Sequence, residues 1–293
     1  MHPLPSRALS VTRRLALAAA ASAIVHCTIG CGDNRTSPAG HPGYVAPDAA
    51  PLSCVPDLDG VLRAGELPTV YDTPEQFLIN PAGSQRPVDV AGVVSSVGVR
   101  TWSFGVDFAD DQTLTVTVSH VQQKWYAGSF PSGQFVSAQD AGGTIEGVYR
   151  RDDAGVYLLG LASATEKPPE GKTLLVYDAP IPVAKLPLAP GASWVAAGTI
   201  TGGVIRGLPY AGKDTYEVTD DAVGRLVTHS YTFEQVHRLR TAVTVSPSAG
   251  KVIARKQVAF FSECIGEVLR ATSRDGETNA DFTVAAELRR LGL

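Results

Sequence analysis

Residues 113–121 read TLTVTVSHV, and this stretch shows the pattern that decides the fold. Apolar Leu114, Val116 and Val118 alternate with hydroxyl-bearing residues. A period of two is typical of a β-strand with one buried and one exposed face. We therefore expect the leucine and valine side chains to pack in a core and the hydroxyl-rich face to meet solvent.

The same alternation continues over most of the chain beyond residue 68, and turn signals follow about every ten residues, as in all-β domains. Tight turns are predicted at residues 152–155 (DDAG) and 220–224 (DDAVG), where aspartate and glycine are favoured. Only residues 74–78 and 284–290 are candidates for short helices. The predicted fold class is all-β: a mainly antiparallel β-meander that forms a curved sheet or open barrel.

Residues 15–32 read LALAAAASAIVHCTIGCG and follow Arg13 and Arg14. A basic start before a short apolar run is typical of a secretory signal peptide, and the run is shorter than the roughly 20 apolar residues of a membrane span. We predict that residues 1–30 are removed. The sequence TIG before Cys31 resembles the lipobox of bacterial lipoproteins, which makes Cys31 the predicted lipidation site. An ordinary signal peptide cleaved nearby is the alternative, and the twin-arginine route is a second option for export.

Residues 31–53 are rich in proline, alanine and glycine and lack apolar periodicity, so we predict a flexible tether. Removal of residues 1–30 takes away three arginines and no acidic residue, which leaves 22 basic and 29 acidic residues, a net charge of about −7. An acidic chain is a poor partner for nucleic acid.

Cys54 and Cys264 are the two cysteines that remain in the mature chain besides Cys31. Because exported proteins meet an oxidising environment, we expect a disulfide between them. A loop of about 210 residues closed in this way restrains the unfolded chain by on the order of 5 kcal/mol in the chain-entropy model. Two buried free thiols are the alternative.

Residues 166–190 (EKPPEGKTLLVYDAPIPVAKLPLAP) are rich in proline. Proline lacks a backbone donor, so we expect this segment to cross an edge or to link halves of the sheet. It is also a candidate domain boundary. A bridge between the ends of the folded part nevertheless favours a single β-rich domain over residues 54–293.

Four segments of the second half form a recurring pattern: residues 156–160 (VYLLG), 186–194 (LPLAPGASW), 231–233 (YTF) and 260–268 (FFSECIGEV). Together they resemble uncharacterised secreted or lipid-anchored bacterial β-proteins, domains of unknown function that are similar to the outer-membrane lipoprotein carriers. The resemblance covers roughly residues 145–285. It implies a curved antiparallel half-barrel in which Trp194 packs in a core and Gly266 allows a close strand approach or a bulge.

One pattern in the chain points to a metal. Asp57, Asp59 and Glu66 match positions 3, 5 and 12 of an EF-hand calcium loop. The first position, normally aspartate, is Val55, and this favours an ordinary turn.

Other candidate chemistry is weaker still. The chain has pairs of adjacent aspartates at 110–111, 152–153 and 220–221, which fit solvated turns better than catalytic carboxylates. His120, His229 and His237 have no metal-ligand spacing, and we expect them at the surface or at an edge. We expect a solvated basic cluster from Arg238, Arg240, Lys251, Arg255 and Lys256. No catalytic, cofactor-binding or metal residue is assigned.

These observations predict a lipid-anchored lipoprotein of the bacterial cell envelope, on the periplasmic or outer-membrane face, with a non-catalytic β-domain. Its expected partners are the membrane, through the anchor, and either an envelope protein or an apolar or amphiphilic ligand held in the concave sheet. A secreted hydrolase that uses the turn carboxylates is the alternative from another class.

Overall fold

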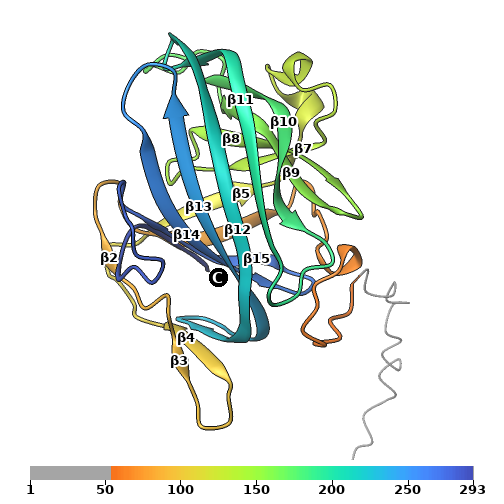
Figure 1. Cartoon of the computed structure of the whole chain (residues 1–293), viewed down its shortest axis with the longest axis vertical. Helices are drawn as coiled ribbons and strands as arrows, with labels where there is room; N and C mark the ends of the chain where they lie inside the picture. The colour runs from red at the N-terminus through yellow and green to blue at the C-terminus, as the bar shows by residue number, and fades with distance from the viewer. Residues whose placement is uncertain (1–53, 293) are drawn as a thin grey trace, which may run out of the picture. The chain divides into compact units, whose positions relative to one another are not determined.

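A computed structural model describes residues 54–292, which fold into one large β-sheet (Figure 1). Thirteen strands follow one another in the hydrogen-bonded order β5-β1-β16-β15-β14-β13-β12-β11-β10-β9-β8-β7-β6. The sheet curls until it is a nearly closed barrel, and its neighbours along this path are antiparallel, as the sequence predicted. The predicted signal peptide (residues 1–30), the tether (residues 31–53) and Cys31 lie outside the described residues.

The strands on this path have the following bounds: β1 Pro74–Ile79, β5 Gln112–Thr117, β6 Ser119–His120, β7 Phe135–Ala138, β8 Ile145–Asp152, β9 Gly155–Ser163, β10 Leu174–Lys185, β11 Ser193–Ile205, β12 Leu208–Thr228, β13 Thr232–Pro247, β14 Ile253–Ser262, β15 Gly266–Ser273 and β16 Val284–Leu291. Off the path lie β2 Arg86–Pro87, β3 Val93–Val94 and β4 Arg100–Phe104. Three short 3-10 helices complete the described elements: η1 Ala64–Glu66, η2 Val121–Gln123 and η3 Ala127–Ser129. No helix among residues 54–292 is long and apolar enough to cross a membrane.

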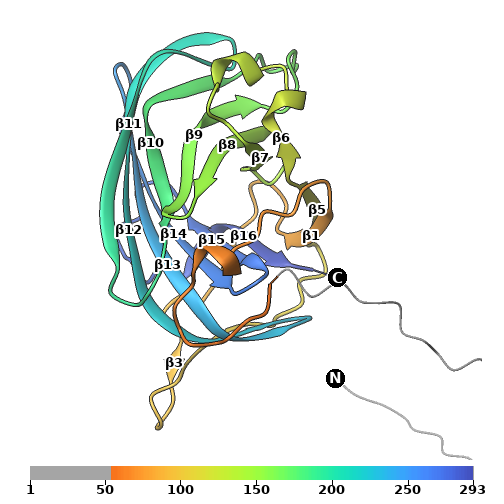
Figure 2. The ribbon, with the colours of Figure 1, turned by 90° about the vertical axis from the view of Figure 1, so that its right-hand side faces the viewer.

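The two ends of the sheet, β5 and β6, are consecutive in the chain and are separated by Val118 alone. The carbonyl of Val118 accepts a hydrogen bond from Asp72 N at 2.9 Å. The ring of Tyr71 stacks on His120, with their centroids 3.9 Å apart. Figure 2 shows the short strands β1, β5, β6 and β7 across the interior from the long strands β10 to β13.

Strand β5 confirms the alternation in residues 113–121. Leu114 and Val116 are buried, whereas Thr113, Thr115 and Thr117 are exposed. The predicted turn at residues 152–155 is also confirmed, because Asp152 pairs with Gly155 at the tip of the β8–β9 hairpin.

Both predicted helices are wrong. Residues 74–78 lie in β1 and residues 284–290 lie in β16. In β16 the charged residues Glu287 and Arg289 line cavities inside the barrel, while Leu288 packs in a core on its outer side. A strand that carries charges on its inner face has the mixed composition of an amphipathic helix, which explains the error.

The predicted turn at residues 220–224 is wrong as well. Strand β12 continues through it, with register shifts between Asp220 and Ala222 and between Gly224 and Leu226. These β-bulges bend the strand without ending it. The real turns of β12 lie at Arg206–Gly207, where both residues have positive φ, and after Thr228.

The proline-rich segment forms β10, which pairs with β9 along most of its length but with β11 only at Leu174–Val204. Its central place between β9 and β11 was not expected. Proline has no backbone N–H to donate, and the pairing of β10 with β9 is accordingly irregular. Its register shifts between Val176 and Ile181 and between Pro182 and Ala184.

One end of the barrel is covered by the segment that follows Cys54. The predicted disulfide is present, with the Cα atoms of Cys54 and Cys264 5.5 Å apart. Leu62 pairs with Leu188 through two backbone hydrogen bonds of 2.9 and 2.8 Å. Both leucines pack against Trp194, which is buried in a core as the resemblance implied.

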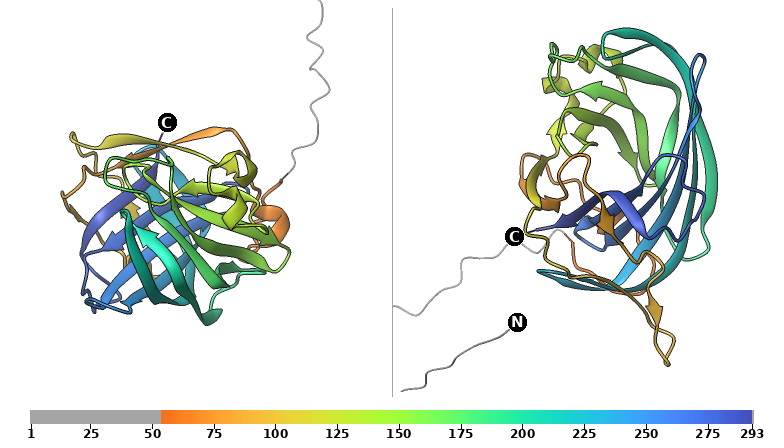
Figure 3. Two further views of the ribbon diagram at one scale, coloured as in Figure 1. Left: turned by 90° about the horizontal axis from the view of Figure 1, so that it is seen from above. Right: turned by 90° about the vertical axis from the view of Figure 1, so that its left-hand side faces the viewer.

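A second layer covers the outer face of β12 to β16. The segment that contains β2, β3 and β4 runs along this face, and β4 pairs with β12 in parallel (Figure 3). Trp102 and Phe104 of β4 pack edge-on against Phe260 of β14. These side chains belong to the largest buried apolar group of the described residues, so the wall of the barrel is packed on both sides here.

Buried arginines hold this outer segment to the barrel. Asp111 lies between Arg86, whose Nη2 is 2.8 Å from its Oδ1, and Arg290, whose Nη2 contacts its Oδ2. The side chain of Asp111 is 6% exposed, that of Arg86 7% and that of Arg290 1%. The neighbouring Asp110 also pairs with Arg86 but is 61% exposed.

We predict that Asp111→Asn lowers the free energy of unfolding by about 3 kcal/mol, because two buried guanidinium groups, those of Arg86 and Arg290, lose the carboxylate that they share. The matched change Asp110→Asn alters it by about 0.5 kcal/mol or less, since this pair is mostly solvated. Urea unfolding of the disulfide-intact protein measures both. Equal effects of the two variants would show that Asp111 does not neutralise the buried arginines.

Candidate functional site

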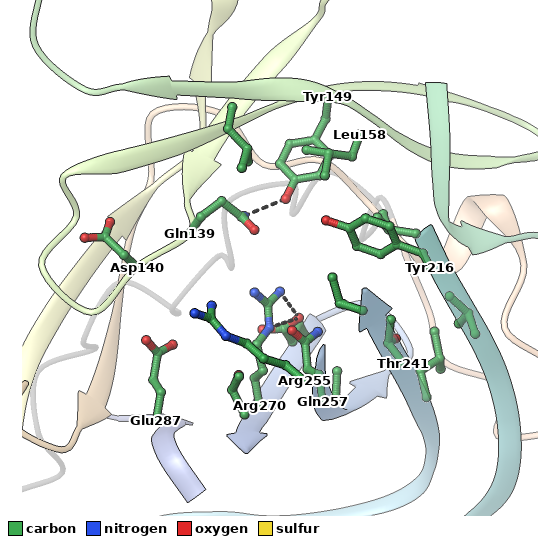
Figure 4. Close-up of a pocket in the computed structure, with 18 of the residues that line it drawn as sticks. Gln139, Asp140, Tyr149, Leu158, Tyr216, Thr241, Arg255, Gln257, Arg270 and Glu287 are labelled. Atoms are coloured by element: carbon green, nitrogen blue, oxygen red, sulfur yellow. Dashed lines mark hydrogen bonds and ion pairs between the residues drawn. The ribbon is translucent and has the colours of Figure 1, made fainter. Parts of the chain in front are cut away.

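The inner face of the sheet encloses a cavity of about 360 Å³ (Figure 4). Its lining residues come from opposite sides of the barrel, from β8 and β9 across to β13, β14 and β15. Protein sites for small molecules have volumes of roughly 300–1,000 Å³. The cavity is therefore large enough for a small organic ligand.

The cavity has an apolar side and a polar side. Ile145, Leu158 and Leu161 of β8 and β9 form the apolar side, together with Val183 of β10. The opposite side is mixed: it carries the polar and charged residues of β13 to β15 beside apolar Leu239, Val243, Ala259 and Phe261. The polar and charged residues are Thr241, Arg255, Gln257, Glu267, Arg270 and Thr272. Figure 4 shows Leu158 and Tyr149 facing Arg255, Gln257 and Arg270 across the open space.

A β-bulge places the main charged pair inside. Phe261 of β14 is opposite Glu267, but Phe260 is opposite Leu269, so β15 carries one extra residue at Val268. In a regular strand, residues three apart face opposite sides of the sheet. The extra residue turns both Glu267 and Arg270 toward the cavity.

Arg270 forms an ion pair with Glu267 in which two guanidinium nitrogens contact the same carboxylate oxygen. Arg270 Nη2 lies 2.5 Å and Nε 3.1 Å from Glu267 Oε2. Burial alone would lower the pKa of Arg270, but the charge of Glu267 raises it, so the guanidinium stays charged. Its Nη1 group has no hydrogen-bond acceptor among the residues that the structure describes, and it belongs to a side chain that lines the cavity.

Two tyrosine hydroxyls complete the polar lining. Gln139 Nε2 donates to the hydroxyl of Tyr149 at 2.5 Å, and burial raises the pKa of Tyr149 to about 12. Burial raises the pKa of Tyr216 as well. Both hydroxyls are therefore neutral at physiological pH, and Figure 4 shows them directed toward the same space.

A second interior cavity, of about 210 Å³, adjoins the first. The two share six lining residues: Gln139, Tyr149, Val183, Phe261, Glu267 and Arg270. The second cavity extends toward Leu67 and Val70, next to the segment that covers the end of the barrel. The Glu267–Arg270 pair thus stands between two spaces and faces both.

The aspartate pairs behave differently from one another. Asp152 and Asp153 are exposed, as expected for a turn. Asp220 is buried and the side chain of Asp111 is only 6% exposed, so the expectation of a solvated position is wrong for these two. Asp221 is exposed but lies in β12, not in a turn, and pairs with Arg238 at 2.7 Å. An arginine or a histidine partner compensates each of them, which the sequence pattern did not reveal.

The basic cluster also divides. Arg238 is buried and donates from Nη1 to the carbonyl of Val90 at 2.6 Å, so it helps to hold the outer segment. Arg240 pairs with Asp221 at 2.5 Å. Arg255 is among the residues that line the cavity, but its side chain is 51% exposed and pairs with Asp275, so it is solvated as expected. The expected solvated surface cluster is therefore wrong for Arg238.

His237 is fully buried, contrary to the expected surface position. Its Nδ1 lies 2.8 Å from Oδ2 of Asp220, and both side chains are 0% exposed. Neither residue lines either of the two interior cavities. The pair has the composition of a catalytic dyad, but its burial separates it from any substrate in those cavities.

Residues suited to a cation meet where the covering segment touches the β14–β15 turn. Ligand atoms of Asp57, Asp59 and Glu263 lie within 4.8 Å of one another. Glu66, the expected twelfth-position residue, instead accepts a hydrogen bond from Arg63 N at 2.8 Å. The sequence pattern therefore located two of these carboxylates and missed the third.

The sequence also did not reveal Glu267, Arg270, Tyr149 and Gln139 as a group. Glu267 and Arg270 are three residues apart, so in a regular strand they would face opposite sides of the sheet. Only a bulge between them brings both to the same face. Gly266, which has φ of +93°, was the only available signal, because a glycine at the start of a strand permits irregular backbone.

Asp214 is a buried carboxyl on the inner side of β12, two residues before Tyr216. Tyr177 donates its hydroxyl to Asp214 Oδ2 at 2.7 Å, while Oδ1 has no partner among the described residues. Burial raises the pKa of Asp214. Its protonated form therefore stabilises the fold below the pKa of the unfolded chain, and this contribution is lost as the pH rises through the raised folded value.

We predict that Asp214→Asn raises the free energy of unfolding at pH 7 and that this gain shrinks as the pH falls, because Asp214 then takes up a proton and becomes neutral itself. Urea unfolding between pH 4 and pH 8 measures the difference. Asp153→Asn, in an exposed turn, serves as the control and should show no such trend. A gain that is constant with pH would contradict the raised pKa.

Comparisons of this chain with protein-family models, with curated proteins and with solved structures find no match.

Proposed function

We propose that this chain is a cell-envelope lipoprotein, anchored through Cys31, whose barrel interior binds a small amphiphile without changing it chemically. The cavity carries this proposal, because it places an apolar wall opposite the guanidinium group of Arg270, whose Nη1 has no acceptor within residues 54–292. The predicted export signal, the lipobox-like sequence before Cys31 and the acidic, disulfide-bonded domain support the location.

The apolar wall suits a hydrocarbon chain. Transfer of apolar surface out of water stabilises a complex by roughly 25 cal/mol per Å². Leu158, Leu161 and Val183 offer such a surface inside the barrel. The cavity volume of about 360 Å³ limits the ligand to a short chain or a small ring system.

The polar side suits an anionic head. Nη1 of Arg270 can donate a charge-assisted hydrogen bond to a carboxylate or a similar group, and such bonds are shorter and stronger than neutral ones. Glu267 keeps Arg270 charged and fixed in orientation. The hydroxyls of Tyr149 and Tyr216 add neutral groups near the same point.

Two large aromatic side chains, Trp194 and Phe260, leave this space open. Trp194 points inward but packs against Leu62 and Leu188 at the covered end, where its Nε1 donates to Pro182 O at 2.7 Å. Phe260 lies on the outer face, against Trp102. Neither side chain lines the cavity, which favours a ligand-binding role over a purely structural one.

We predict that decanoate binds to the protein and that Leu161→Trp weakens binding at least tenfold, because the larger ring occupies the apolar wall. Val195→Trp introduces the same ring at a position of β11 that is 68% exposed and should leave binding unchanged. Isothermal titration calorimetry measures affinity, and Tm shows that both variants are folded. Equal affinities would place the binding site outside this cavity.

We also predict that decanoate binds about tenfold more tightly than decan-1-ol, which has the same chain but a neutral head. A hydrogen bond to a charged group contributes about 1.5–3 kcal/mol. Equal binding of the two ligands would exclude Arg270 as the partner of the head group.

The anchor is tested separately. We predict that intact-mass and peptide analysis of protein taken from its native envelope shows Cys31 as an acylated N-terminal residue. An unmodified mature N-terminus would rule out the lipid anchor and leave a secreted β-domain.

A further inference from the structure

Two distant parts of the chain bring three carboxylates together at the covered end of the barrel. Asp57 and Asp59 belong to the turn after Cys54, and Glu263 precedes Cys264 in the chain. The disulfide fixes these parts beside each other, and the ligand atoms of the three residues lie within 4.8 Å of one another. This arrangement is independent of the interior cavity and of the function proposed for it.

Glu263 gives the decisive observation. Glu263 is buried, with 3% of its surface exposed. Oε2 accepts a hydrogen bond from Leu58 N at 2.9 Å, which directs the carboxylate toward the turn, whereas Oε1 is buried without a partner among the described residues. A buried carboxylate oxygen that lacks a partner is costly, and a bound cation removes that cost.

The guanidinium of Arg63 shows that positive charge is attracted to this turn. Its Nη2 lies 2.7 Å from Asp59 Oδ2, and its Nη1 lies 3.7 Å from Asp57 Oδ2 and 3.2 Å from the carbonyl oxygen of Val61. Asp57, Asp59 and Val61 stand at positions 3, 5 and 7 of the calcium-loop pattern, which are ligand positions. Among the described residues, Arg63 makes no ion pair with Glu263.

We propose that Asp57, Asp59 and Glu263 form a calcium site, and that Arg63 is the counter-charge that a bound ion displaces. Calcium accepts six to eight oxygen ligands in flexible geometry, and water supplies the positions that the protein leaves free. Asp57 and Asp59 are partly exposed, which allows water to reach the ion. The side chain of Arg63 is 47% exposed and can turn into solvent.

Calcium at this position would join the turn that carries Leu62 to the β14–β15 turn. Leu62 is fully buried against Trp194 at the covered end of the barrel. Bound calcium therefore fastens that cover by a second link beside the disulfide.

The test uses the mature, disulfide-bonded protein, with calorimetric titration by CaCl₂ and thermal unfolding. We expect a Kd of about 0.1–1 mM, the range of extracellular calcium modules, and a rise in Tm of about 4 °C at 10 mM CaCl₂. MgCl₂ should give a much smaller shift, because magnesium requires strict octahedral geometry.

Three variants decide the assignment. Asp59→Asn and Glu263→Gln should each weaken calcium binding at least tenfold, whereas Asp153→Asn, which removes the same charge from an exposed turn, should not. Arg63→Gln should tighten binding several-fold, because the competing cation is gone. The proposal is overturned if the unaltered protein binds no calcium, including the case in which only Arg63→Gln binds it, or if Asp153→Asn weakens binding as much as Asp59→Asn.

Discussion

The continuous hydrogen-bonded ladder from β5 to β6 is the constraint on which the remaining structure depends. Because the sheet curls upon itself, alternate side chains of every strand must share one limited interior. Tyr149, Arg270 and Glu287 come from three separate strands and are brought to the same cavity for this reason. Polar groups so enclosed need partners, and the interior supplies them through the Glu267–Arg270 and Glu287–Arg289 pairs.

Around residues 258–261, the wall formed by β13 to β15 is covered on both faces. Val258 and Phe260 point to the outer core, while Ala259 and Phe261 line the cavity, so the run VAFF has no solvent-facing position. Strands buried on both faces read as continuous apolar runs. The outer layer requires its own charge balance, which Asp111 and Asp221 provide for the arginines beneath it.

Local alternation was sufficient to predict an all-β fold from residues such as Leu114 and Val116, and cysteine usage was sufficient for the disulfide. The sequence could not place Asp220, because a bulge lets β12 pass through a segment that has the composition of a turn. A bulge between Glu267 and Arg270 also reverses the inward and outward alternation of β15, so strand periodicity did not show that the two residues share a face. The sequence did not indicate Glu263 as a candidate ligand, because Asp57 and Asp59 are close to it only in the folded chain.

Val118 has a mechanical consequence. It joins the two ends of the sheet, and its carbonyl is tied to Asp72. In a fully closed barrel, hydrogen bonds join every strand to two neighbours. Here β5 and β6 are not neighbours in the ladder and are joined by the peptide chain through Val118. The two ends of the described sheet are therefore held together by the chain itself, so that β5 and β6 cannot separate at Val118 by more than the length of one residue.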